Sequence, residues 1–271
     1  GASAFNASPA VSDHAVYVGG RDKTLYAHDR SSGAERWQYE TKMWVDSSPL
    51  VYDGTVLVGS NDFRLYALDA EDGSFEWEYD TGGEIGVSSP AVADDVVYVA
   101  GGSGTLSAVD RHTGIERWSF DTQFSLPTTP AVTEQHVYVG SSQNRLYAVD
   151  ADEGTRNWVF HTAGAVESSP AVWEDTVIFG AGDGTLHAVN ETGTERWSQS
   201  LGQRILSDPI VVGNTVVVGC CDDNVYALDV RDGRPIDRFD TGGWVTTSPA
   251  FANGHVYIGA VTGVHCLALT R

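Results

Sequence analysis

The chain has 271 residues, of which 41% are hydrophobic and 10% aromatic, enough to bury a sizeable core. It carries 37 Asp and Glu against 16 Lys and Arg, a net charge of −21, with no run of basic residues. A nucleic-acid-binding protein needs a basic surface that releases counterions from phosphates, so this composition excludes that function. No apolar run is long enough to cross a bilayer as a helix, and the three cysteines are too few for a disulfide framework.

The acidic excess also predicts adaptation to concentrated salt. Lys23 and Lys42 are the only lysines, so nearly all of the basic residues are arginines. At high ionic strength the carboxylates are screened from one another, and a repulsion that strains a protein in dilute buffer becomes tolerable. We therefore expect a protein from a halophile with an acidic surface. The alternative is an acidic domain without such adaptation.

A small polar residue followed by proline recurs at a nearly constant interval along the whole chain. These prolines are separated by 40, 41, 40, 40, 39 and 40 residues, and they are Pro9, Pro49, Pro90, Pro130, Pro170, Pro209 and Pro249. Self-similarity at this period is typical of propellers and solenoids. The chain therefore contains seven tandem repeats in register.

The residue pattern within each repeat predicts four short strands. In the second repeat an apolar stretch follows the proline, and an alternating run then ends on Gly59. A second alternating run covers residues 65–69, and a turn at Gly73 leads to a last run that contains Trp77. Alternation with period two and regularly spaced turn residues are typical of antiparallel strands. Seven four-stranded sheets bury both faces by packing around an axis, so we expect an all-β, seven-bladed β-propeller.

The boundaries of the fold follow from the two ends of the chain. We expect residues 1–271 to form a single propeller domain, because the repeats run through the whole sequence. Only eight residues precede Pro9, and the last repeat stops after a third strand, Cys266–Leu269, that is shifted by one residue. The seventh blade is therefore predicted to be incomplete, with an outer edge that is open or covered only by Ala2–Ala7.

One tryptophan recurs near the end of five repeats, four residues after a glycine. These tryptophans are Trp37, Trp77, Trp118, Trp158 and Trp197. Each indole is expected to bury a large surface between adjacent sheets. Asp237 stands at this position in the sixth repeat, so that junction is expected to be weaker or held differently.

The motifs Ser-Pro-Ala-Val, Val-Tyr-Val-Gly, Leu-Tyr-Ala-Leu-Asp, Asp-Gly and Trp resemble the pyrroloquinoline-quinone-type (PQQ-type) propeller repeat over nearly the whole chain. This resemblance implies that the five tryptophans dock on the neighbouring blade and lock the ring. The family contains large quinoprotein dehydrogenases, which hold the quinone and a calcium ion, and smaller cofactor-free propellers that scaffold envelope proteins or sense ligands. The chain resembles the second group, because it lacks the inserted loops and calcium ligands of the enzymes.

Aromatic and arginine side chains gather in the loops of one expected face. This face combines the loops between successive repeats with the turns between second and third strands. The candidate binding residues are Trp44, Phe63, Arg64, Phe124, Arg145, Arg204 and Trp244. Such residue types are typical of interaction hot spots. The alternative is that Trp44, Phe124 and Trp244 fill the axial channel as additional core.

Cys220 and Cys221 are expected on the same face, at the tip of the sixth repeat. Adjacent cysteines can close a strained ring disulfide, and the resemblance implies a contact with a quinone because quinoprotein dehydrogenases place such a ring against theirs. The alternative is that the two cysteines replace the small polar pair of the other repeats, such as Ser60-Asn61.

The leading hypothesis is a non-catalytic scaffold at the cell surface or envelope, in an extracellular or cell-surface location, that binds a protein or small ligand through this face. It has no catalytic residues, no metal site and no cofactor, and an export signal or lipid anchor is expected to have preceded residue 1. The alternative hypothesis is a PQQ- and calcium-dependent dehydrogenase, or a degenerate relative that still binds the quinone.

Overall fold

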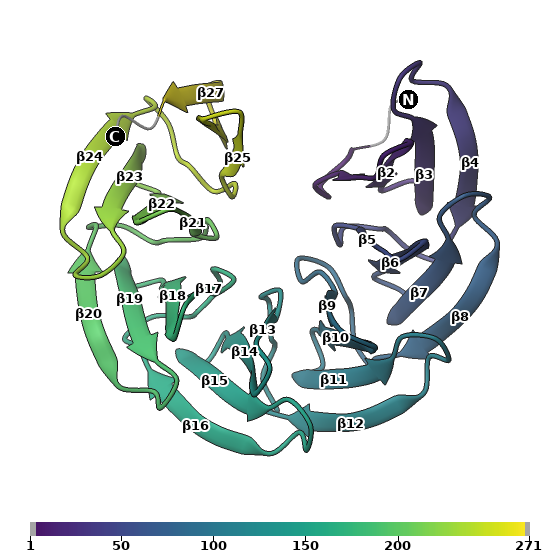
Figure 1. Cartoon of the computed structure of the whole chain (residues 1–271), viewed down its shortest axis with the longest axis horizontal. Helices are drawn as coiled ribbons and strands as arrows, with labels where there is room; N and C mark the ends of the chain where they lie inside the picture. Colours follow the sequence, from purple (N-terminus) through teal and green to yellow (C-terminus); the bar gives the residue numbers. More distant parts are fainter. Residues whose placement is uncertain (1–3, 269–271) are drawn as a thin grey trace. The chain divides into compact units, whose positions relative to one another are not determined.

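The computed structural model describes residues 4–268, which form 27 strands and no helix. The strands form antiparallel sheets in chain order, six of four strands and one of three (Figure 1). The strand order within every sheet follows the chain, so each repeat is a simple meander. The predicted all-β, seven-bladed propeller is confirmed. Within the described residues there is no helix long and apolar enough to span a membrane.

Each repeat supplies its strands at equivalent positions. The first strands are β1 (Ala10–Val11), β5 (Leu50–Tyr52), β9 (Ala91–Ala93), β13 (Ala131–Val132), β17 (Ala171–Trp173), β21 (Ile210–Val212) and β25 (Ala250–Ala252). The second strands are β2 (Ala15–Gly19), β6 (Thr55–Gly59), β10 (Val96–Ala100), β14 (His136–Ser141), β18 (Thr176–Gly180), β22 (Thr215–Gly219) and β26 (His255–Ala260).

The third strands are β3 (Thr24–Asp29), β7 (Arg64–Asp69), β11 (Thr105–Asp110), β15 (Arg145–Asp150), β19 (Thr185–Asn190), β23 (Asn224–Asp229) and β27 (Gly263–Ala268). The fourth strands are β4 (Glu35–Glu40), β8 (Phe75–Asp80), β12 (Glu116–Asp121), β16 (Arg156–His161), β20 (Glu195–Ser200) and β24 (Pro235–Asp240).

The chain divides into two compact units. The first comprises Gly1–Val137 with Val149–Thr155, and the second comprises Tyr138–Ala148 with Arg156–Arg271. The first unit holds the first three sheets and the second unit holds the last three, while the strands of the fourth repeat are divided between them.

Burial within a sheet falls from the middle strands to the fourth. β6 is buried at every position and β7 at its four central positions. β8 buries Trp77 alone, which stands opposite Ala67 of β7. The small alanine leaves the adjacent indole free to lie between two sheets, as interior packing at high density requires.

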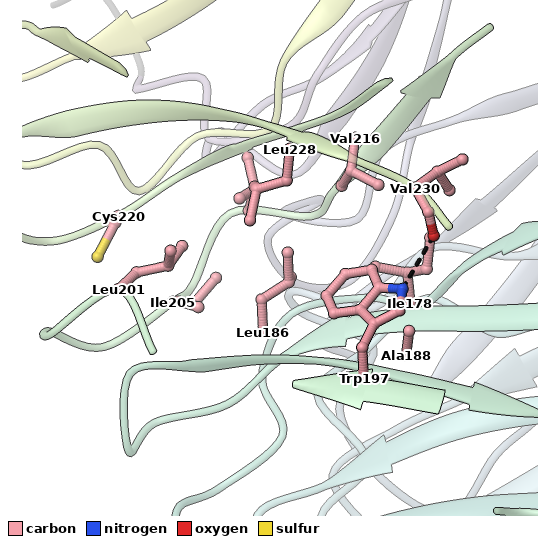
Figure 2. Close-up of a cluster of buried hydrophobic side chains, with 11 residues drawn as sticks. Ile178, Leu186, Ala188, Trp197, Leu201, Ile205, Val216, Cys220, Leu228 and Val230 are labelled. Carbon is pink, nitrogen blue, oxygen red and sulfur yellow. Dashed lines mark hydrogen bonds between the residues drawn. The ribbon is translucent and has the colours of Figure 1, made fainter. Parts of the chain in front are cut away.

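The tryptophans join consecutive sheets through the backbone. Each indole Nε1 donates to a carbonyl just after the third strand of the next repeat: Trp37 to Ala70 (3.2 Å), Trp77 to Arg111 (2.8 Å), Trp118 to Ala151 (2.9 Å), Trp158 to Glu191 (2.6 Å) and Trp197 to Val230 (2.9 Å). Figure 2 shows Trp197 surrounded by aliphatic side chains of the fifth and sixth repeats.

The same indoles also lie against the turn glycine of the next repeat. A Cβ atom at Gly233 would come within 2.4 Å of Cε3 of Trp197, and its φ is 70°. Both the left-handed backbone and the contact with the ring therefore require glycine at this position.

A second series of contacts links the residues that precede the repeat prolines. In the first compact unit the amide of Ser8 donates to the hydroxyl of Ser48, and Ser48 donates in the same way to Ser89. In the second unit the amide of Ser169 donates to the carboxylate of Asp208, whose own amide donates to Ser248. The small polar residue of the repeat motif is thus a hydrogen-bond acceptor for the preceding repeat.

The seventh sheet contains β25, β26 and β27, and no described strand pairs with the other edge of β27. The predicted incomplete seventh blade is confirmed. β27 begins at Gly263, earlier than the expected strand, because Ala260 and Gly263 are paired across a short turn. Ala2, Ser3 and Leu269 lie outside the described residues. Phe5, within the expected covering segment, contacts the ring of Tyr26 in the first sheet.

Candidate binding site

The loops that carry the candidate aromatics are held by a recurring threonine directly after the fourth strand. The Thr41 hydroxyl lies 2.9 Å from the carbonyl of Lys23 and 2.7 Å from that of Met43. Thr241 makes the equivalent contacts with the carbonyls of Asp223 and Gly243. These bonds fix each loop to the turn of its own repeat. These threonines are not among the candidate residues predicted above, although their recurrence at 41, 81, 122, 162 and 241 is a usable signal in the sequence.

Trp44 lies in the first compact unit and is 42% exposed, and the guanidinium group of Arg21 lies over one face of its ring. The Arg21 guanidinium carbon lies 4.8 Å from the centre of the indole, a typical cation–π distance. Arg21 also donates two hydrogen bonds to Asp46, at 2.9 and 3.1 Å, and these raise the arginine pKa. Trp44 is therefore a preorganised surface aromatic and not a member of the buried core.

Phe63 lies in the neighbouring turn of the first unit, and Arg64 begins β7 directly after it. Phe63 is 45% exposed and has a φ of 74°, a left-handed conformation that a bulky side chain rarely adopts. Arg64 pairs with Glu78 at 3.1 Å and with Asp80 at 3.3 Å, both on the adjacent strand β8. The structure thus presents the Phe63 ring to solvent and neutralises the Arg64 charge within its own sheet.

Two further candidates, Phe124 and Arg145, have different surroundings. Phe124, in the first unit, is 37% exposed. Its loop passes close to Gly104, and a Cβ atom at Gly104 would lie 2.6 Å from the amide nitrogen of Phe124. Arg145, in the second unit, donates to the hydroxyl of Tyr147 at 3.2 Å.

A cleft in the second compact unit brings three of the candidates together. Arg204, Cys221 and Trp244 line this cleft, whose volume is about 580 Å³. The remaining lining residues are Gln203, Leu206, Asp222, Asp223 and Thr246. Trp244 is 63% exposed, and Arg204 pairs with Glu167 outside the cleft lining. The cleft combines an exposed indole, a guanidinium and two carboxylates on loops that hydrogen bonds hold in place.

Cys220 is explained by the packing of these loops, and Cys221 lines the cleft. Both are free; Cys220 is buried, and its thiol lies 3.3 Å from the carbonyl of Gln203. Ser60 makes the corresponding contact in the second repeat, with the carbonyl of Met43. Burial raises the pKa of Cys220 to about 12 and also raises that of Cys221, so both remain thiols near neutral pH.

A quinone–calcium centre needs oxygen ligands that hold the calcium ion. Among residues 4–268 there is no group of three or more His, Cys, Asp and Glu side chains that could hold a metal ion. The cysteine pair that the resemblance linked to a quinone presents one buried thiol bonded to a loop carbonyl.

Comparison with known proteins identifies the family. A family model described as outer membrane protein assembly factor BamB matches residues 2–92, 85–190 and 162–259. The chain belongs to the BamB family. This assignment confirms the resemblance to the PQQ-type propellers that the repeat motifs indicated.

Solved structures agree with the assignment to the BamB family. BamB from Moraxella catarrhalis is 25% identical, with a TM-score of 0.86, and the match covers 97% of this chain and 84% of that one. The computationally designed protein Ika8 shares the fold at 19% identity and a TM-score of 0.68, covering 98% of this chain and 96% of its own. No curated protein matches the chain.

Proposed function

We propose that this BamB-family propeller is a non-catalytic scaffold of the cell envelope that binds a partner protein through the cleft around Trp244. The family description, an outer membrane protein assembly factor, supports both the envelope location and the role in assembly. The observation that carries the proposal is the exposed indole of Trp244 beside Arg204 in a cleft of about 580 Å³. Tryptophan and arginine are the residue types most enriched in binding hot spots.

The charge of the protein indicates what kind of partner it binds. Asp222 and Asp223 line the cleft, and the whole chain carries a net charge of −21. Complementarity favours a partner with basic side chains around an apolar contact. In concentrated salt these charges are screened, so the aromatic contact supplies most of the affinity there.

Site-specific photo-crosslinking tests this proposal. A benzophenone amino acid replaces Thr246, which lines the cleft together with Trp244, in one protein and Ile115 in a matched control. Ile115 is 67% exposed, and it lies in the turn before β12. Both proteins are irradiated with envelope extract in high salt. We expect a discrete crosslinked protein at position 246 that is absent at 115 and is diminished by Trp244→Ala and by Arg204→Ala. The same crosslinks at both positions would contradict the proposal.

Quinone binding is tested separately by titrating the protein with pyrroloquinoline quinone and calcium in high salt. We expect no saturable quenching of tryptophan fluorescence. Saturable quenching that requires calcium and is lost in Cys221→Ser would favour the alternative function.

A further inference from the structure

A cavity of about 290 Å³ lies between the sixth and seventh sheets, both within the second compact unit. Its lining includes Val217, Val225, Ala227, Asp237, Val256 and Leu267. None of the residues that line this cavity lines the cleft around Trp244. The cavity is therefore a separate site.

The cavity occupies the position of the missing tryptophan. In the fifth sheet Trp197 stands opposite Ala188, and in the sixth sheet Asp237 stands opposite Ala227 in the same register. Both pairings are followed by the same register shift, so the two strands are equivalent residue by residue. The carboxylate is too short to replace the indole, and a space remains.

The walls around this space match those that surround Trp197. By strand register, four lining residues have counterparts in the junction of the fifth and sixth sheets: Val217 corresponds to Ile178, Val225 to Leu186, Val256 to Val216 and Leu267 to Leu228. All four counterparts belong to the buried cluster that encloses the Trp197 indole in Figure 2. The aliphatic walls are thus kept although the side chain between them is absent.

The consequence for exposure is visible along β24. β20 buries Trp197, whereas β24 is exposed at all of its positions. The buried cluster at this junction consists of Val217, Val225, Val245, Val256 and Ile258 and contains no aromatic residue. Apolar surface that remains in contact with water favours a ligand that would cover it.

We propose that this cavity binds a planar aromatic group of indole size that carries an N–H donor. The aliphatic walls supply the same surroundings that hold an indole one junction earlier. The Asp237 carboxylate lines the cavity from the strand position that Trp197 occupies one junction earlier, and there it accepts the N–H of the bound group. The group is provided either by a free indole compound or by a tryptophan side chain of another polypeptide.

Fluorine NMR with 5-fluoroindole as the probe tests the site on the whole chain. The variant Asp237→Trp fills the cavity with the side chain found in the other repeats, and Val217→Phe fills it from β22 of the same sheet. Trp244→Ala, which alters only the separate cleft, is the matched control. We expect saturable line broadening in the wild-type protein and in W244A, and its loss in D237W and V217F. The analogue 1-methyl-5-fluoroindole, which lacks the donor, should bind about fivefold more weakly.

Competition distinguishes the two sources of the group. Displacement of the probe by N-acetyltryptophanamide assigns the cavity to a polypeptide tryptophan, and displacement by indole alone assigns it to a free compound; either result supports the site. The proposal would be overturned if the wild-type protein showed no saturable binding of the probe. It would also be overturned if D237W and V217F bound the probe as strongly as the wild-type protein does. Because the control variant lacks the cleft aromatic, this outcome is independent of partner binding through Trp244.

Discussion

Trp197 donates from its indole to the carbonyl of Val230, 2.9 Å away and 33 residues further along the chain. Replacing Trp197 by alanine removes a buried aromatic and leaves a cavity, so the free energy of unfolding should fall by about 3–5 kcal/mol. Urea denaturation measures this change. Trp244→Ala is the control, and because that side chain is 63% exposed the expected change is within about 0.5 kcal/mol. Equal losses in the two variants would contradict the docking role of Trp197.

Phe63 adopts a left-handed backbone conformation, and this predicts opposite effects on stability and binding. Phe63→Gly removes the strain of a φ of 74° and should raise the free energy of unfolding by about 1 kcal/mol. If the exposed ring contributes to a binding surface, partner capture should weaken in the same variant. Asn144→Gly is the control, because asparagine tolerates its φ of 58° more readily. A destabilised F63G protein would refute the strain at this turn.

Asp208 replaces the small hydroxyl residue of most repeats, and burial raises the pKa of its carboxyl above the ordinary value of 3.8. The folded state therefore favours the protonated form. The stability that Asp208 contributes is fully present below the pKa of its carboxyl in the unfolded chain. It is lost as the pH rises through the higher pKa of that carboxyl in the folded protein. Asp208→Ser should accordingly be more stable than the wild-type protein at neutral pH, and the difference should shrink toward pH 4. Thermal melts from pH 4 to 8 measure this, and a constant difference would contradict it.

The net charge of −21 predicts that the fold depends on salt. The screening length falls from about 10 Å at 0.1 M salt to about 3 Å at 1 M, which weakens repulsion among carboxylates. The melting temperature should therefore rise between these concentrations, by about 2–4 °C for each kcal/mol gained. Sodium and potassium chloride should act alike if screening is the cause. A melting temperature indifferent to both salts would remove the prediction of halophilic adaptation.

The repeat made most of the fold predictable. Prolines at nearly constant spacing set the register, and Gly73 and Trp77 at fixed offsets marked the turn and the last strand of their repeat. A period of 40 residues leaves few alternatives, since each short sheet must bury both faces against others of its kind. The presence of only three strands in the seventh blade, as far as residues 4–268 describe it, followed from the same count.

The candidate site was less accessible from the sequence. The cleft depends on loops from two repeats whose side chains, Arg204 and Trp244, are 40 residues apart, and a repeat pattern does not define their separation in space. The pattern gave the replacement of a small polar pair by the two cysteines as one of two alternatives, but the contact of the Cys220 thiol with a loop carbonyl, equivalent to that of the Ser60 hydroxyl, required the structure. The absence of a tryptophan at Asp237 was apparent, but the retained walls of the space beside it required the strand registers.

The tryptophan contacts also bear on how such a chain can change in length. Each indole recognises the next repeat through a main-chain carbonyl and a glycine that has no side chain, as Trp197 does with Val230 and Gly233. Neither group depends on the identity of the other residues in that repeat. When a repeat is duplicated or deleted, the two repeats that become adjacent can therefore form the same tryptophan contact. Duplication within the gene can then alter the number of blades without simultaneous substitutions in both repeats.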